Sequence, residues 1–290
     1  MHIPALLDET IRYLAPSDNQ TFIDCTFGEG GHSLEILSHL GPKGRLLGID
    51  YDCGTITSAG KKFASYKNQL TLVCDNFTNL SSITKKYHFE KVDGILLDLG
   101  FSSRQLEKSG LGLSFQKNEP LDMRISLKSG SITAQEIINR WPEYKLEKIF
   151  KEYANEPRAK KIARLIAQFR QKEKIRYSLQ LAQLIEQAFD SQFSHRHPAT
   201  KVFQALRIAV NHELENLKQV LPQATDTLKK GGKLAVISFH SGEDRIVKNF
   251  FRGTANLKIL TKKPIQPTVA EIKNNRRSRS AKLRVAQKKI

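Results

Sequence analysis

The segment from Thr21 to Ser33, TFIDCTFGEGGHS, constrains the fold of this chain more than any other. Its apolar start predicts a short buried strand that ends at Asp24, and residues 33–40 predict the helix that follows. Between them, the glycines of residues 28–31, GEGG, supply backbone that can adopt positive φ and approach a ligand closely. A strand, a tight glycine turn and a helix N-terminus form a cradle for a polar cofactor that carries adenosine.

A second apolar segment, residues 46–49, is closed by Asp50, twenty residues after Gly30. An acidic side chain at this offset accepts hydrogen bonds from ribose hydroxyls. The dinucleotide fingerprint G-x-G-x-x-G is incomplete, because Ser33 stands in place of its third glycine. The pattern therefore favours a nucleoside cofactor other than NAD or FAD. A generic βαβ turn followed by a loop aspartate is the structural alternative.

Two further apolar segments continue the strand pattern. Residues 70–74 lead to Phe77, whose ring is a candidate to stack on an adenine, although ordinary packing also explains a single aromatic residue. Residues 92–98 have the continuous apolar character of a central parallel strand and end at Asp98. In an open parallel sheet the chemistry lies beyond the carboxyl ends of the strands, which is where Asp98 falls.

The pattern changes after Arg104. Residues 105–200 show helical periodicity and few strand signals, so they predict an all-helical insertion domain between residues 1–104 and 201–290. Within the insertion, Thr133 and Glu136 predict a capping box. Apolar residues from 203 to 221 predict one long helix, and residues 229–232, KKGG, predict its end. Strands are then expected over residues 233–239, 257–260 and 282–286.

The charge of the chain points to a polyanionic partner. It has 47 lysines and arginines against 29 aspartates and glutamates, a formal net charge of +18. Such an excess favours binding to nucleic acid, although a basic surface can also serve solubility. Basic residues gather in the insertion between residues 158 and 174, and residues 273–290 contain no acid. Both segments are candidates for contact with RNA phosphates.

The remaining composition predicts a soluble, cytoplasmic protein. The first residues lack the basic start of a signal peptide, and no apolar run approaches the length that spans a membrane. The three cysteines, Cys25, Cys53 and Cys74, lack metal-ligand spacing and are expected to be reduced thiols. His240, Glu243 and Asp244 follow a predicted strand, where a polar loop is expected rather than a metal site.

The tetrapeptide from Asp98 to Phe101, DLGF, suggests a reaction. It stands where amino-methyltransferases that use S-adenosylmethionine carry Asp-Pro-Pro-Tyr or Asp-Pro-Pro-Phe, and it resembles that motif without the prolines. An exocyclic amine of cytosine or adenine is a poor nucleophile, because its lone pair is delocalised into the ring. A carboxylate that accepts one of its N–H bonds directs the lone pair toward the methyl group. We therefore take Asp98 and Phe101 as candidate catalytic residues, with Phe101 stacking on the base.

Signature segments along nearly the whole chain narrow the resemblance. In order they are His2–Leu7, Phe27–Ser33, Gly94–Gly100, Pro120–Arg124, His197–Thr200, Phe203–Asn211, Ile237–Ser241 and Arg279–Arg284. Together they resemble the RsmH (MraW) family. The resemblance implies a class I S-adenosylmethionine-dependent methyltransferase, an α/β Rossmann-like fold with a mainly parallel sheet and an antiparallel last strand, interrupted by the helical insertion.

The family resemblance also implies an activity and a site. The activity is methylation of N4 of a decoding-region (P-site) cytidine in 16S rRNA of the small ribosomal subunit, without a metal. The cofactor contacts carried over by motif are Gly30, Gly31, His32, Asp50, Phe77, Asp98 and Gln105. Asp98 thus has two possible duties, toward the base and toward the cofactor. Gly242 and Asn275 depart from the family pattern, but both lie outside this set.

Three alternatives remain open. A non-catalytic, RNA-binding ribosome-assembly factor would explain the charge, although it would not need the glycine turn, Asp50 and Asp98 together. An NAD-dependent oxidoreductase is disfavoured by Ser33. Methylation of DNA cytosine keeps the reaction and changes the substrate. The sequence does not predict the oligomeric state.

Overall fold

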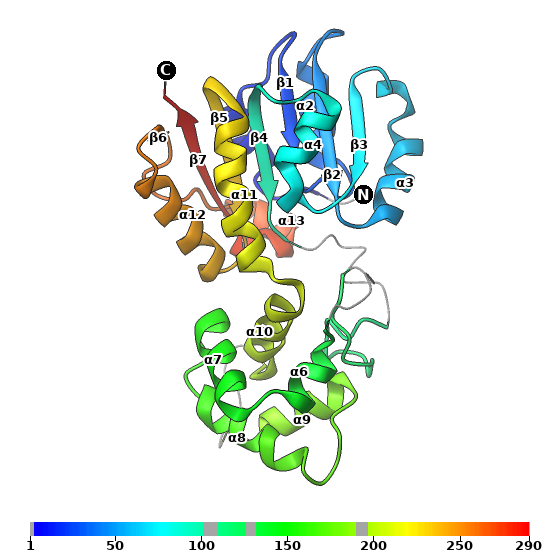
Figure 1. Cartoon of the computed structure of the whole chain (residues 1–290), viewed down its shortest axis with the longest axis vertical. Coiled ribbons are helices and arrows are strands. Elements are labelled where there is room, and N and C mark those ends of the chain that lie inside the picture. The colour runs from blue at the N-terminus through cyan, green and yellow to red at the C-terminus, as the bar shows by residue number, and fades with distance from the viewer. Residues whose placement is uncertain (1–2, 101–109, 126–131, 190–196, 290) are drawn as a thin grey trace. The chain divides into compact units, whose positions relative to one another are not determined.

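The computed structural model describes residues 3–100, 110–125, 132–189 and 197–289 (Figure 1). The chain divides into two compact units, one formed by residues 1–102 with 214–290 and the other by residues 103–213. The first unit contains the glycine turn and is an α/β sandwich, whereas the second is helical. The division into domains 1–104, 105–200 and 201–290 stays a prediction.

The described part of the first unit contains one sheet of seven strands. They are β1 (Thr21–Asp24), β2 (Arg45–Asp50), β3 (Leu70–Cys74), β4 (Val92–Asp98), β5 (Leu228–Ser238), β6 (Leu257–Ile259) and β7 (Lys282–Lys288). Their order across the sheet is β3-β2-β1-β4-β5-β7-β6. The pairs from β3 to β5 are parallel, and β7 runs antiparallel to both β5 and β6. The expected mainly parallel sheet with an antiparallel last strand is confirmed.

Helices cover both faces of this sheet because its strands are apolar on both sides. Successive residues alternate, so that Ile23 packs with Leu80 and Leu217 while Phe22 packs with Leu6 and Ile36. The helices on the Phe22 face are α1 (Leu7–Leu14), α2 (Gly31–His39) and α3 (Cys53–Lys62). Those on the Ile23 face are α4 (Leu80–Tyr87), α11 (Glu213–Thr227) and α12 (Ser241–Gly253), and Figure 1 shows α11 in front of the sheet. Short segments complete the unit: η1 (Ala64–Tyr66), η2 (Phe77–Asn79), α13 (Val269–Asn274) and η3 (Arg276–Ser280).

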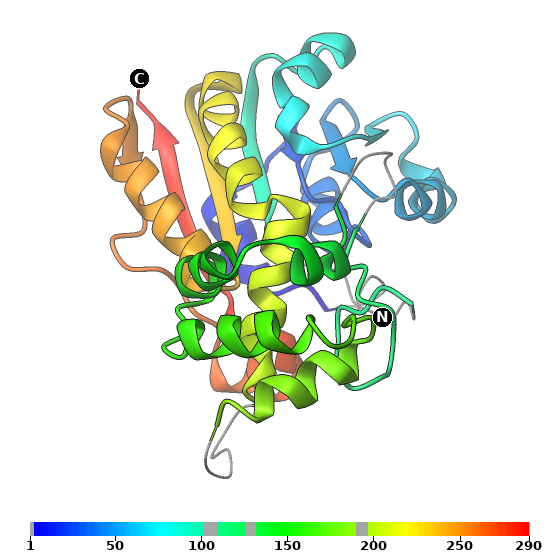
Figure 2. The ribbon, with the colours of Figure 1, turned by 60° about the horizontal axis from the view of Figure 1, so that its bottom comes forward.

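The second unit packs its helices around an apolar core of its own. The helices are α6 (Ala134–Arg140), α7 (Glu143–Ala154), α8 (Ala159–Phe169), α9 (Ser178–Glu186) and α10 (Ala199–Asn211), seen from a second direction in Figure 2. Phe150, Ile162 and Leu206 are fully buried in this core. The predicted capping box is present, because the Thr133 hydroxyl accepts from the backbone N–H of Glu136 and the Glu136 carboxylate accepts from that of Thr133. Within the described ranges, no helix is long and apolar enough to span a bilayer.

One sequence prediction about the return to the α/β unit is wrong. The single helix expected from residue 203 to 221 is two helices, because His212 adopts left-handed backbone with φ of +52° and ends α10. The predicted helix end near residues 229–232 is confirmed, because α11 ends at Thr227. The strand expected from residue 233 begins earlier, since β5 starts at Leu228, which pairs with Val92 before a shift in register.

The expectation of three reduced thiols is also wrong. Cys53 and Cys74 form a disulfide with a Cα–Cα distance of 5.0 Å, and Cys25 is free and buried. Strand register brings the pair together, because Asp50 at the end of β2 pairs with Cys74 at the end of β3. Cys53 begins α3 three residues after Asp50. A sequence separation of 21 gave no sign of this proximity.

Candidate active site

Packing explains two glycines of the turn between β1 and α2. Gly30 has φ of +77°, and a Cβ atom there would lie 2.5 Å from Cζ of Phe63. A Cβ atom at Gly31 would overlap the ring of Pro4. Neither position accepts a side chain unless its neighbours move. Glycine at Gly30 and Gly31 is therefore required by the fold itself, in addition to any approach of a ligand. The helix begins at Gly31, two residues before its predicted start at Ser33.

Three aspartates lie at the carboxyl ends of neighbouring strands. Asp24, Asp50 and Asp98 end β1, β2 and β4, which are parallel and adjacent in the order β2-β1-β4. Burial is the main cause that raises the pKa of each carboxyl, to about 6 for Asp24 and about 8 for Asp98. The three side chains share one edge of the sheet. In their ionised form they concentrate negative potential there, which favours a cationic ligand.

Asp24 holds the turn together. Its Oδ1 atom accepts from the backbone N–H of Thr26 at 3.0 Å, and its Oδ2 atom accepts from the Ser33 hydroxyl at 2.7 Å. The side chain is 2% exposed and joins the end of β1 to α2. Nothing in the sequence distinguished Asp24 from the other aspartates that end strands, so its positioning role was missed.

Asp50 is oriented by backbone N–H groups. Oδ2 accepts from the N–H of Gly28 at 2.8 Å, which joins the glycine turn to the end of β2, and Oδ1 accepts from the N–H of Asp52 at 2.8 Å. The backbone of Tyr51 also bonds to this carboxylate. The residue is partly exposed, and its two oxygens have four lone pairs, so the carboxylate can accept a further hydrogen bond from a ligand hydroxyl.

Phe77 begins η2, directly after β3 and the Cys53–Cys74 disulfide. Its ring is partly buried against the apolar cluster that includes Leu80. The part of the ring that remains accessible can contact a ligand. Two strands, β2 and β1, separate β3 from β4 in the sheet, so Phe77 stands apart from Asp98.

His32 and Asp98 form a pair. Nδ1 of His32 lies 3.5 Å from Oδ2 of Asp98. Nε2 of the same ring lies 3.1 Å from the carbonyl oxygen of Ala5, which can only accept, so Nε2 donates. Oδ1 of Asp98 is buried and has no hydrogen-bond partner among the described residues.

The contact of 3.5 Å between Nδ1 of His32 and Oδ2 of Asp98 is favourable when a proton lies between the two side chains. Without that proton, the lone pairs of the ring nitrogen and of the carboxylate would face each other. The raised pKa of Asp98, caused first by burial and then by the charges of Asp24 and Glu243, agrees with a carboxyl that takes up a proton readily.

The polar residues after β5 form a helix start. Glu243 accepts from the backbone N–H groups of Phe239 and His240 at 2.8 and 3.3 Å, and Nδ1 of His240 accepts from the N–H of Glu243 at 3.4 Å. Asp244 accepts from Nε of Arg284 at 2.6 Å. His240, Glu243 and Asp244, which were predicted to form a polar loop, therefore make their contacts at the start of α12.

Phe101 and Gln105 lie outside the described residues. The other predicted site residues, Gly30, Gly31, His32, Asp50, Phe77 and Asp98, belong to the α/β unit. The structure brings His32 to Asp98 and joins the glycine turn to Asp50. The assignment of these residues to a cofactor or a substrate stays a prediction.

Comparisons with known proteins place the chain in a family. The model of the MraW methylase family matches residues 1–289. A protein of Thermotoga neapolitana named ribosomal RNA small subunit methyltransferase H is 44% identical over 291 residues, which cover 99% of this chain and 95% of the relative. A protein of the same name from Dictyoglomus thermophilum is 45% identical over 292 residues, which cover 100% of this chain and 97% of the relative. A solved structure of an rRNA methylase from Streptococcus thermophilus, 10% identical, aligns over 100% of both chains with a TM-score of 0.48. With a family match over nearly its whole length and relatives above 40% identity, this chain belongs to the MraW methylase family.

Proposed function

We propose that this protein uses S-adenosylmethionine to methylate the exocyclic N4 amine of the decoding-region (P-site) cytidine in 16S rRNA of the small ribosomal subunit. Family membership and the names of the relatives support methyl transfer to small-subunit rRNA. The net charge of +18 suits an RNA substrate. The observation that best supports an amine as the methylated group is the Oδ1 atom of Asp98 at the end of β4, which is buried and has no hydrogen-bond partner among the residues that the structure describes.

The described residues fit the cofactor. When bound, S-adenosylmethionine supplies an electrophilic methyl group on a sulfonium cation, and the strand-end carboxylates provide the negative potential that suits this cation. Asp50 would accept from the ribose hydroxyls, and Phe77 would contact the adenine. Gly30, Gly31 and His32, together with Gln105, would complete the contacts. Asp98 can interact with the cofactor as well as the base.

Asp98 is also the group that would prepare the amine. Its Oδ1 atom accepts one N–H of the cytosine amine, and the carbonyl of Leu99 accepts the other, while Phe101 stacks on the base. Two acceptors hold the amine so that its lone pair points away from the ring plane. The sulfonium already provides a good leaving group, so this scheme uses no metal.

The amine must lose one proton when the new N–C bond forms. Oδ1 of Asp98 is the acceptor in this proposal, because it is buried and has no other hydrogen-bond partner in the described part of the chain. Asp98 must be ionised beforehand, and burial together with the charges of Asp24 and Glu243 raises the pKa of this carboxyl to about 8. His32, whose Nδ1 atom lies 3.5 Å from Oδ2 of Asp98, is a positioning residue in this proposal. An rRNA substrate places this reaction in the cytoplasm.

Nucleoside analysis tests the proposal. Small subunits that lack the modification are incubated with the protein and with methyl-labelled S-adenosylmethionine, then digested and separated by mass. We expect the label in N4-methylcytidine, at one position of 16S rRNA. Label in another nucleoside would contradict the proposed site of methylation. Saturable cofactor binding without transfer to naked rRNA or to subunits would support the non-catalytic assembly factor instead.

A further inference from the structure

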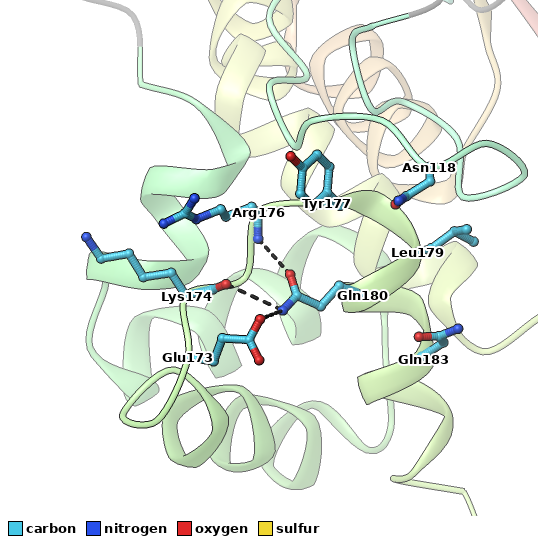
Figure 3. A pocket seen from close by; sticks show the side chains of 8 residues that line it. All are labelled: Asn118, Glu173, Lys174, Arg176, Tyr177, Leu179, Gln180 and Gln183. Carbon is cyan, nitrogen blue, oxygen red and sulfur yellow. Dashed lines mark hydrogen bonds between the residues drawn. The ribbon is translucent and has the colours of Figure 1, made fainter.

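A shallow pocket of about 280 Å³ lies on the helical unit, on and beside the start of α9 (Figure 3). Figure 3 shows Gln180 at its centre, with Lys174 and Arg176 on one side, Asn118 on the other and the Tyr177 ring between them. Its size is near the lower end of ligand pockets, roughly 300 to 1,000 Å³. The pocket therefore suits a ligand about as large as one nucleotide.

The backbone that carries Arg176 and Tyr177 is fixed on both sides. The carbonyl of Arg176 accepts from the N–H of Leu121 at 3.0 Å, and the N–H of Ser178 donates to the carbonyl of Glu119 at 2.8 Å. The fully buried Ser178 side chain also donates to the carbonyl of Lys117 at 2.6 Å. Since the backbone is already ordered, the side chains can bind a ligand without the cost of ordering a loop.

Gln180 lies at the bottom of the pocket, where hydrogen bonds hold its side-chain amide in place. Its Oε1 atom accepts from the backbone N–H of Arg176 at 2.9 Å, and its Nε2 atom donates to Oε1 of Glu173 at 2.9 Å. Gln180 is therefore engaged within the protein. The exposed amide of Asn118 and the second carboxylate oxygen of Glu173 are the polar groups at the rim that can meet the edge of a base.

The side chains above Gln180 have the composition of a binding site for single-stranded RNA. Tyr177 is 45% exposed, so part of its ring is accessible to a ligand. Lys174 and Arg176 beside it are exposed and cationic. An exposed aromatic face stacks on unpaired bases, and neighbouring cations bind the phosphates.

We infer that this pocket binds an unpaired nucleotide of the RNA substrate, with the base against the Tyr177 ring and the phosphate near Lys174 and Arg176. The inference deepens the proposed function and rests on it for the identity of the RNA. The nucleotide concerned is one other than the methylated cytidine, since the active site holds the cytidine itself. Such a pocket contributes to the choice of target without taking part in methyl transfer.

The test measures the affinity of the full-length protein for a labelled single-stranded RNA with the decoding-region sequence. Loss of base stacking in Tyr177→Leu weakens binding about 5- to 150-fold, and Tyr177→Phe, which keeps the ring, stays within about twofold of the wild type. The matched control is Tyr144→Leu, because Tyr144 is 66% exposed on α7 of the same unit and does not line the pocket. This control keeps wild-type affinity. Equal affinities of Tyr177→Leu and Tyr144→Leu would overturn the inference.

The cations give an independent readout. Arg176→Gln lowers the slope of log affinity against log salt by about 0.7, the loss of one phosphate contact to a single strand. Affinity for S-adenosylmethionine, measured by calorimetry, stays the same in all variants. An unchanged salt slope for Arg176→Gln would exclude the phosphate contact and with it the proposed pose of the nucleotide.

The two experiments distinguish an error in the pocket assignment from an error in the proposed function. If the wild type transfers methyl groups to rRNA but Tyr177→Leu binds RNA as tightly as the wild type, only the assignment of the pocket to RNA is overturned. No methyl transfer to any rRNA, together with a loss of RNA affinity in Tyr177→Leu, supports the pocket and contradicts the function. Loss of affinity only for particles that contain ribosomal proteins would assign the pocket to a protein partner and overturn the inference.

Discussion

Nδ1 of His32 lies 3.5 Å from Oδ2 of Asp98, and this pair joins the helix after β1 to the end of β4. The Nε2 atom of the ring is already bonded to the carbonyl of Ala5, so Nδ1 is the ring nitrogen that faces the carboxylate. The protonation state of Asp98 sets whether it can accept the proton of the amine. The chemistry of the site therefore depends on pH.

The rate of methyl transfer should rise with pH. Asp98 must be ionised to accept a proton, and its pKa is raised to about 8. We expect kcat/KM for S-adenosylmethionine to rise about tenfold per pH unit below that pKa and to level off above it. His32→Asn removes the imidazole beside Asp98, so the midpoint of the profile should shift in this variant. A profile that is identical in His32→Asn and in the wild type would exclude an influence of His32 on Asp98.

The stability of the cofactor-free protein should fall as pH rises. Asp24 and Asp98 have a raised pKa in the folded protein, so the folded state binds more protons than the unfolded state above the unfolded value of 3.8. The stabilisation is complete below that value and is lost as pH rises through about 6 for Asp24 and about 8 for Asp98. For Asp24 the loss is about 3 kcal/mol. Denaturant unfolding of the wild type and of Asp98→Asn isolates the contribution of Asp98, and Asp98→Asn should lose less stability between about pH 5 and pH 9. Equal losses in the two proteins would contradict the assignment.

Alanine substitutions at two glycines, one in the turn and one in a helix, distinguish backbone strain from the low helix propensity of glycine. Gly30→Ala forces a side chain onto a residue with φ of +77° and against Phe63, so it should lower the free energy of unfolding by at least about 1 kcal/mol. A Cβ atom at Gly60 in α3 would meet no side chain within 4 Å. Gly60→Ala should therefore raise the free energy of unfolding by about 0.5 to 1 kcal/mol. Similar effects of the two changes, measured by denaturant unfolding, would show that the turn tolerates a side chain.

The Cys53–Cys74 disulfide should stabilise the fold near Asp50. It closes a loop with a sequence separation of 21, for which the loss of chain entropy in the unfolded state gives about 3 kcal/mol. Reductant should lower the free energy of unfolding of the wild type by up to this amount. It should not affect the double variant Cys53→Ala/Cys74→Ala, which is the control. Titration of the unfolded, unreduced protein should find one thiol, that of Cys25, and three thiols would contradict the bond.

The parts of the fold that follow from local pattern were predictable, and those that follow from tertiary contact were not. Apolar runs that end in Asp50 and Asp98 predicted strands and placed both acids at one edge of the sheet. The left-handed residue His212 has no sequence signal of its own, so the break between α10 and α11 was missed. The disulfide was missed because register, rather than spacing, brings its cysteines together. The same holds for the approach of His32 to Asp98, which depends on tertiary contacts of the His32 ring, including the one to Ala5.

The most direct test of the central claim is methyl transfer by Asp98→Asn to small subunits that lack the modification, with cofactor affinity measured by calorimetry on the same preparation. Asparagine keeps the size of the side chain and loses the ability to accept the proton. We predict that transfer falls by about 10² to 10⁴ while the dissociation constant for S-adenosylmethionine changes only a few fold. Normal turnover with normal cofactor binding would contradict the role of Asp98 in the reaction.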